Sequence, residues 1–128
     1  MSAPAVRHAL DVITRILDAA GGQPVAVVVV DQAGQVVGSA RGDGLNAVAV
    51  DFARRKAVAS ATFGAPTRVL SDNFAQDPLL PAAFAGSAEV CLLPGGFPIL
   101  VDGAPVGGVG ISGGHWSQDH EIGEKALT

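Results

Sequence analysis

Hydrophobic positions in the first third of the chain predict one amphipathic helix followed by a pair of strands. Apolar residues recur at three- and four-residue spacing from a helix start near Pro4 until Gly21-Gly22 ends the pattern. The run from Val25 to Val30 is β-branched and continuously apolar, which is typical of a central strand covered on both faces. A turn then predicts that a second strand, Gln35 to Arg41, returns antiparallel.

The middle of the chain predicts a long helix with a face of small residues. Asn46 can cap a helix that runs from about Ala47 to Phe63. Four alanines recur at every fourth position of this helix: Ala49, Ala53, Ala57 and Ala61. Such a ridge lets the helix lie close to a sheet or to another helix, and Lys56 falls on the same inner side. Residues 64–87 contain several glycines and prolines, and we interpret them as a helical excursion or lid with a short helix from Thr67 to Phe74.

The last third predicts three strands and a closing helix. The strands are expected at about Glu89 to Leu93, Phe97 to Val101 and Pro105 to Ser112. Asp102-Gly103 is a hairpin turn between the last two, and a helix from about Ser117 to Leu127 follows. Because tight hairpins occur within each strand group, we predict an α+β fold in one domain, residues 1–128, with a single layer of five antiparallel strands packed with helices.

Eight of the 17 glycines lie between residues 95 and 116, which is unusual for a segment that otherwise resembles two strands. Glycine weakens a strand unless another backbone, a helix or a ligand comes unusually close. We expect Gly107, Gly108 and Gly110 to admit a closely packed helix. Gly113-Gly114 precede His115-Trp116 at a helix start, where backbone N–H groups favour anions, so this turn is expected to border a ligand site.

Composition narrows the class of protein. The net charge of −4 argues against nucleic acid as a partner, since a nucleic-acid interface needs a basic patch. Hydrophobic residues make up 48% of the chain and charged residues 16%, which favours burial of apolar surface between copies in a homo-oligomer. No run approaches the length of a membrane span, and the N-terminus lacks the pattern of a signal peptide, so we expect a cytoplasmic protein without membrane contact. Cys91 is the single cysteine, which excludes a disulfide framework and predicts a buried apolar side chain.

Several blocks, taken in order, resemble the GlcG/HbpS family: Val25 to Asp31, Gly34, Arg41 to Gly44, Lys56-Ala57, Gly95 to Ile99, Gly107 to Gly114, and Asp119. This family is also similar to the C-terminal domain of PduO-type corrinoid adenosyltransferases. The resemblance implies a five-stranded antiparallel sheet packed with helices, a profilin-like sandwich, in dimers that assemble up to octamers. It also implies binding or degradation of haem, although some relatives are cofactor-free hydroxylaminobenzoate lyases, and one fold commonly hosts several functions.

Lys56 is the strongest candidate in the sequence for a catalytic or ligand-binding side chain. A lysine on an inner helix face must be desolvated, which lowers its pKa, or paired with a carboxylate, for which Asp31, Asp43 and Asp119 are possible partners. It is therefore either a general base, an electrophile or an anchor for a substrate carboxylate, or one half of a buried ion pair. Arg41, beside Asp43 at a strand end, could bind a substrate carboxylate or a haem propionate, or pair with Asp43 or with a neighbouring subunit.

The histidines bear on haem, because the chain has no tyrosine and its one methionine is terminal. His8 is expected to be solvated, whereas His115 and His120 flank the start of the last helix. Their spacing does not match a zinc motif, so no metal site built from protein side chains alone is predicted. The expected site comprises Lys56, Arg41, Asp119 and His115, with Trp116 and Phe97 as apolar walls.

Two functions from different classes fit this site. The first is a small-molecule-binding protein that holds haem or a related planar ligand. The second is a cofactor-independent lyase or isomerase acting on a small carboxylated or aromatic compound, in which Lys56 and His115 transfer protons, Arg41 holds the carboxylate and Asp119 orients the base. A ligand-free assembly or accessory domain is the third possibility.

Overall fold

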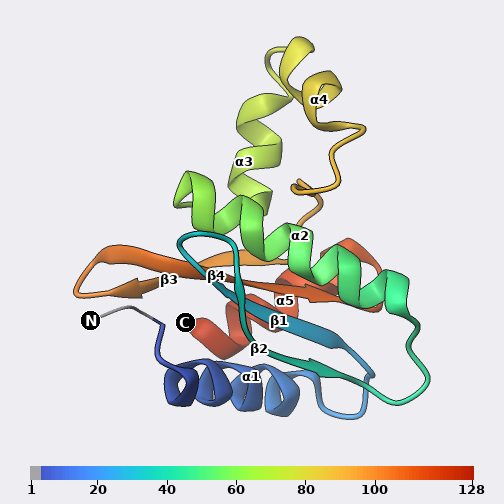
Figure 1. Cartoon of the computed structure of the whole chain (residues 1–128). Helices are drawn as coiled ribbons and strands as arrows, with labels where there is room; N and C mark the ends of the chain where they lie inside the picture. The colour runs from blue at the N-terminus through green and yellow to red at the C-terminus, as the bar shows by residue number, and fades with distance from the viewer. Residues whose placement is uncertain (1–3) are drawn as a thin grey trace.

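The computed structural model describes residues 4–128 as a four-stranded sheet with five helices (Figure 1). The elements in chain order are α1 (Val6–Ala20), β1 (Ala26–Asp31), β2 (Val36–Arg41), α2 (Ala47–Phe63), α3 (Thr67–Phe74), α4 (Leu79–Phe84), β3 (Gly96–Val101), β4 (Ala104–Ser112) and α5 (Trp116–Leu127). The strands are all antiparallel and lie in the order β2-β1-β4-β3, so β1 and β4 are central. None of the helices in the described part of the chain is long and apolar enough to cross a membrane.

The sheet is the middle of three layers, with α1 and α5 against one face and α2 across the other (Figure 1). β1 is buried on both faces, as its unbroken apolar run predicts. Val27 and Val29 pack with α1 and α5, while Val28 and Val30 pack with α2. The alternation of side chains along one central strand thus supplies both halves of the hydrophobic core.

Gly108 and Gly110 admit a closely packed helix, which confirms the prediction for these two glycines. The prediction is wrong for Gly107, where a Cβ atom would meet the carbonyl oxygen of Val30 and the side chain of Pro4, with no atom of α2 among its nearest neighbours. A Cβ atom at Gly108 or Gly110 would collide with the backbone carbonyl oxygen of Ala57 or Ala53 in α2. A Cβ atom at Gly96, which pairs with Gly110 in the β3–β4 ladder, would lie 2.6 Å from the carbonyl oxygen of Lys56. At these three glycines helix α2 therefore rests directly on the backbone of β3 and β4.

Most predicted elements are present with ends shifted by only one or two residues. The Asn46 side chain accepts a hydrogen bond from the backbone N–H of Ala49 at 3.2 Å, so it caps α2 as expected. Asp102 and Gly103 both have positive φ, 51° and 79°, as a two-residue hairpin turn requires. The predicted excursion contains a second short helix, α4, and projects from the body (Figure 1).

The prediction of five strands is wrong, because residues 89–93 do not join the sheet in the described chain. This segment runs along the outer side of α2, where the backbone N–H of Cys91 donates to the carbonyl oxygen of Arg55 at 3.2 Å. Val90 packs against the α2 side of the core. The apolar run thus reflects burial against a helix. A short apolar run does not by itself distinguish a strand within a sheet from an extended segment that packs on a helix.

We predict that Gly110→Ala lowers the free energy of unfolding by about 3 kcal/mol, because α2 can admit the methyl group only by moving off the sheet. Gly86→Ala is the matched control, since Gly86 has no positive φ and a Cβ atom there meets nothing within 4 Å. This control should change stability by less than about 1 kcal/mol. Urea denaturation compares the two, and equal effects would show that α2 does not rest on the glycine backbone.

Candidate functional site

Lys56 and Asp119 form a buried ion pair that joins α2 to the first turn of α5. The Lys56 Nζ atom lies 3.1 Å from Asp119 Oδ2 and donates a second hydrogen bond to the carbonyl oxygen of Ile111 at 2.7 Å. Both side chains are only 2% exposed. The pairing left open by the sequence is therefore with Asp119, and the lysine is held between the end of β4 and α5.

Burial shifts the pKa of each partner towards its neutral form. Desolvation lowers the pKa of Lys56, and the charge and hydrogen bond of Asp119 oppose this change. Desolvation raises the pKa of Asp119, while Lys56 and the backbone N–H of Gly114 oppose it. Each charge therefore depends on the other, because neither has enough contact with water to be solvated alone.

The same carboxylate connects to the turn that starts α5. Asp119 Oδ1 accepts a hydrogen bond from the Gly114 N–H at 3.3 Å. His115 caps the helix: its Nδ1 atom accepts from the Ser117 N–H at 3.2 Å, and its own N–H donates to the Gln118 side chain at 3.2 Å. This arrangement makes His115 an exposed helix cap whose ring lies 4.7 Å from the ring of Trp116.

The structure divides the predicted site residues into three places. Five of them gather around the start of α5: Lys56, Gly114, His115, Trp116 and Asp119. Gly113 adjoins them in a tight turn with φ 140°, against the backbone of Pro24. Arg41 and the exposed Asp43 lie at the end of β2, and Phe97 lies in the core beneath α5. The catalytic roles of Lys56, His115 and Asp119 stay predictions.

A hollow of about 350 Å³ lies between α3 and α5, where Phe97 meets His120. Its lining consists of Pro66, Arg68, Val69, Asp72, Phe97, His120, Glu124 and Thr128. The His120 ring stacks on Phe97 with 5.3 Å between centroids and 17° between planes. Only 6% of His120 is exposed. Its Nε2 atom lies 3.4 Å from Glu124 Oε1, and its Nδ1 atom is buried without a hydrogen-bond partner among the described residues.

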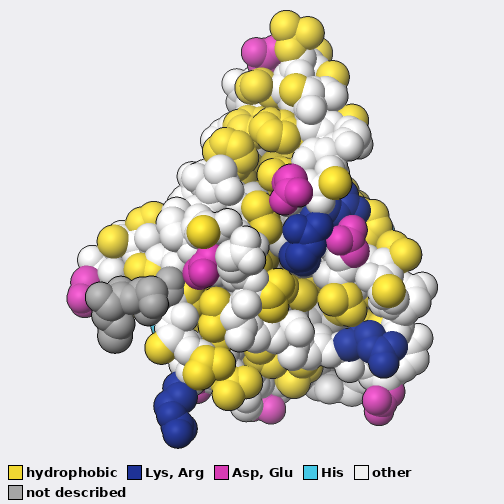
Figure 2. All heavy atoms as spheres, viewed as in Figure 1, with side chains coloured by type: hydrophobic (Ala, Val, Ile, Leu, Met, Phe, Trp, Pro, Cys, Tyr) yellow, Lys and Arg dark blue, Asp and Glu magenta, His cyan; other side chains and the backbone are white. Residues whose placement is uncertain are grey.

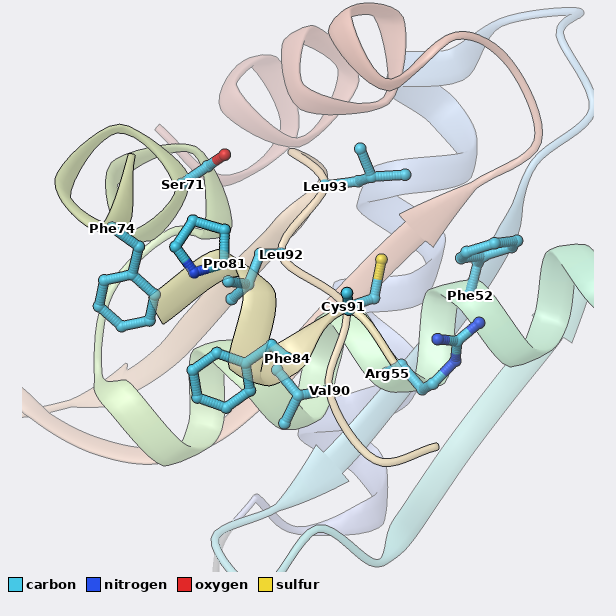
Figure 3. A pocket seen from close by; sticks show the side chains of 11 residues that line it. Phe52, Arg55, Ser71, Phe74, Pro81, Phe84, Val90, Cys91, Leu92 and Leu93 are labelled. Atoms are coloured by element: carbon cyan, nitrogen blue, oxygen red, sulfur yellow. The ribbon is translucent and has the colours of Figure 1, made fainter. Parts of the chain in front are cut away.

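A second hollow, of about 270 Å³, lies between α2, the α3–α4 excursion and residues 90–93 (Figure 3). Its walls are mostly apolar, and Arg55 and Cys91 supply the charged group and the sulfur. The Arg55 guanidinium lies 4.6 Å above the Phe52 ring and 3.0 Å from Asp51 Oδ2. Within residues 4–128, no group of three or more His, Cys, Asp or Glu side chains is placed to hold a metal ion.

Sequence reasoning missed several residues of these hollows. Glu124 follows His120 by four residues, so their contact could have been predicted as a helical i, i+4 pair. Arg55 follows Phe52 by three residues, which is the spacing of the observed cation–π contact. The stacking of His120 on Phe97 joins α5 to β3, however, and no local spacing encodes such a contact.

Comparisons with known proteins agree with this fold. A family model described as "Haem degrading protein HbpS-like" matches residues 2–128. The crystal structure of HbpS superposes with a TM-score of 0.85 at 29% identity, covering 98% of this chain and 89% of that one. The crystal structure of a PduOC–haem complex gives a TM-score of 0.85 at 27% identity, with coverage of 98% and 93%. A relative from Citrobacter freundii, an uncharacterised 15.0 kDa protein from the dhaT–dhaS intergenic region, is 29% identical over 81% of this chain and 74% of its own length.

We predict that Lys56→Met and Asp119→Asn each lower the free energy of unfolding by about 3–5 kcal/mol, because each leaves an unpaired buried charge. The double variant should lose less than the sum of the two. Lys125→Met removes an exposed lysine and is the control, with an expected change below about 0.5 kcal/mol. Additive losses in a double-mutant cycle would show that the two side chains do not interact.

The Lys56→Met variant should also show a characteristic pH dependence. Without the lysine, burial holds the pKa of Asp119 above its unfolded value, so the folded state binds more protons and gains stability as the pH falls towards about 4. The Lys56→Met/Asp119→Asn variant lacks that carboxylate and should not show this gain. The free energy of unfolding of each variant is measured by urea denaturation at several pH values in this range. The same pH dependence in both variants would contradict the raised pKa of Asp119.

Proposed function

This chain belongs to the HbpS-like family of haem degrading proteins, and on that premise we propose that it binds haem in the hollow beside His120. The PduOC relative was solved as a haem complex, which supports the ligand class. The observation that carries the site is His120 itself: a buried imidazole that lines a hollow and whose Nε2 atom is covered by the exposed side chain of Glu124.

The residues of this hollow fit haem in three respects. A volume of about 350 Å³ lies within the roughly 300–1,000 Å³ of small-molecule sites. Pro66, Val69 and Phe97 supply apolar walls for a planar macrocycle, and Arg68 supplies an exposed cation for a propionate. His120 supplies an imidazole, which is a common axial ligand of haem iron.

Each side chain has a defined task in this proposal. Glu124 covers the Nε2 atom of His120, and because its side chain is 59% exposed it can rotate into water and leave that nitrogen free to hold iron. Phe97 fixes the plane of the imidazole by stacking. Bound haem would supply an iron centre whose chemistry depends on its axial ligand and the polarity around it.

The lyase or isomerase function stays a prediction. Lys56 and Asp119 are each 2% exposed, they bind each other, and neither lines the hollows around His120 and Cys91. Of the three proposed acid–base residues only His115 is open to solvent, and its Nδ1 atom is engaged in helix capping. A general base must reach the proton it removes, so this arrangement favours haem binding.

We also propose that the chain assembles into homo-oligomers, from a dimer up to an octamer, in the cytoplasm. Exposed apolar side chains on several elements support assembly, with Leu79 at 78%, Val48 at 59% and Leu10 at 53% exposure. Light scattering should give a mass that is a multiple of the 12.8 kDa chain. A monomer mass at every concentration would contradict assembly.

Titration with haemin tests the proposed ligand and its site. We expect a saturable shift of the Soret band at one haem per chain, and at least a tenfold loss of haemin affinity in His120→Phe. Phenylalanine keeps the ring on Phe97 and removes both nitrogens, one of which has no partner, so the fold should be retained. Thermal unfolding of the variant checks this.

Three further variants serve as controls, each lacking one alternative iron ligand: His8→Ala, His115→Ala and Cys91→Ser. All three should bind haemin as the unaltered protein does. A loss confined to one of them would move the site to that residue and leave haem binding in place. No saturable shift in the unaltered protein would overturn haem binding altogether.

A further inference from the structure

A third hollow, of about 440 Å³, lies between β1, β2 and the N-terminal half of α2. Its lining consists of Val28, Val36, Ser39, Arg41, Ala47, Val50, Asp51 and Arg54. It lies on the α2 face of the sheet near the β2 edge, whereas Phe97 and His120 lie beside the β3 edge and Phe97 packs on the α1–α5 face. The two hollows are therefore separate sites.

This hollow is positively charged in a protein whose net charge is −4. Asp51 lies 3.1 Å from Arg54, so the two arginines that line the hollow, Arg41 and Arg54, are accompanied by a single lining carboxylate. Glu89 approaches Arg54 only at 3.9 Å and is 78% exposed. Among the described residues, Arg41 has no carboxylate within 4.0 Å. The arginines thus leave positive charge uncompensated.

The Arg41 guanidinium is held in place with most of its donors free. Its Nη1 atom donates to the carbonyl oxygen of Leu45 at 2.6 Å, which uses one of its five N–H groups. Ala47, the first residue of α2, also lines the hollow, and the first turn of this helix contains no acidic residue. The positive end of the helix dipole therefore adds to the charge of the arginine.

The floor of the hollow is apolar. Val28 is 1% exposed, and it lies with Val50 beneath the charged rim, while Val36 forms one edge. Figure 2 shows this combination on the face of the molecule that carries α2 and β2, where two groups of dark blue side chains stand with hydrophobic surface between them. A ligand that satisfies both parts must combine an anion with an apolar body.

From these features we propose that the hollow binds a small aliphatic carboxylate. The carboxylate would accept paired hydrogen bonds from Arg41, whose planar guanidinium matches its geometry, and the hydrocarbon chain would lie on Val28 and Val50. No histidine, cysteine or methionine lines this hollow, so it has no axial ligand for haem iron. The site thus lies beyond the proposed haem function and does not depend on it.

Three related probes test the two requirements separately by isothermal titration calorimetry. Hexanoate carries both the anion and the chain, acetate carries the anion alone, and hexan-1-ol carries the chain alone. We expect saturable binding of hexanoate at one molecule per chain, and binding at least tenfold weaker for the other two. Equal binding of hexanol would show a merely apolar hollow, and equal binding of acetate would show nonspecific charge attraction; either result overturns the proposal.

Arg41→Gln locates the site. This variant should lose hexanoate affinity by about ten- to hundredfold, as expected when one charge-assisted contact is removed. Arg7→Gln is the matched control, because Arg7 is also exposed and lines none of the hollows described above, and its affinity should be unchanged. Circular dichroism confirms that both variants are folded. Hexanoate binding that survives Arg41→Gln, or that is absent from the unaltered protein, contradicts the proposal.

Discussion

The direct contact of α2 with the backbone of β3 and β4 is the constraint on which the rest of the structure depends. Alanines on the helix and glycines on the strands remove every side chain between them, so helix and sheet meet at main-chain distance. Packing of this kind is intolerant of added volume, because neither backbone can yield without breaking its own hydrogen bonds. It fixes both the height and the rotation of α2 over the sheet.

That rotation explains why a lysine is buried in the middle of the molecule. With Ala53 and Ala57 seated on glycines, the intervening Lys56 is directed past Gly95 towards the end of β4 and the start of α5. Asp119 receives it there, and the pair ties the two helical layers together across the sheet. A buried ion pair contributes little net stability, since desolvation offsets attraction, but it disfavours any packing that would separate the charges.

The same three-layer arrangement places the two proposed ligand sites beside opposite edges of the sheet. His120 reaches its hollow because α5 packs over Phe97, with Gly123 leaving room for the aromatic ring. Arg41 reaches its hollow because β2 ends beside the first turn of α2. Each site joins residues from different layers, so a change in the seating of α2 or α5 would alter the corresponding hollow while the sheet persists.

Local patterns in the sequence determined the helices, the hairpins, the Asn46 cap and the close seating of α2, because periodicity, turn chemistry and glycine placement act over a few residues. They also placed Lys56 on the inner face of α2, with an ion pair to a carboxylate as one of its possible roles. Only the tertiary structure decided that Asp119 is that partner, that residues 89–93 cover a helix and add no strand, and that Phe97 faces His120 while Arg41 lies elsewhere. These outcomes depend on which faces of segments far apart in the sequence contact each other. Packing between the helix and sheet layers decides those contacts, and the spacing of residues along the chain does not encode them.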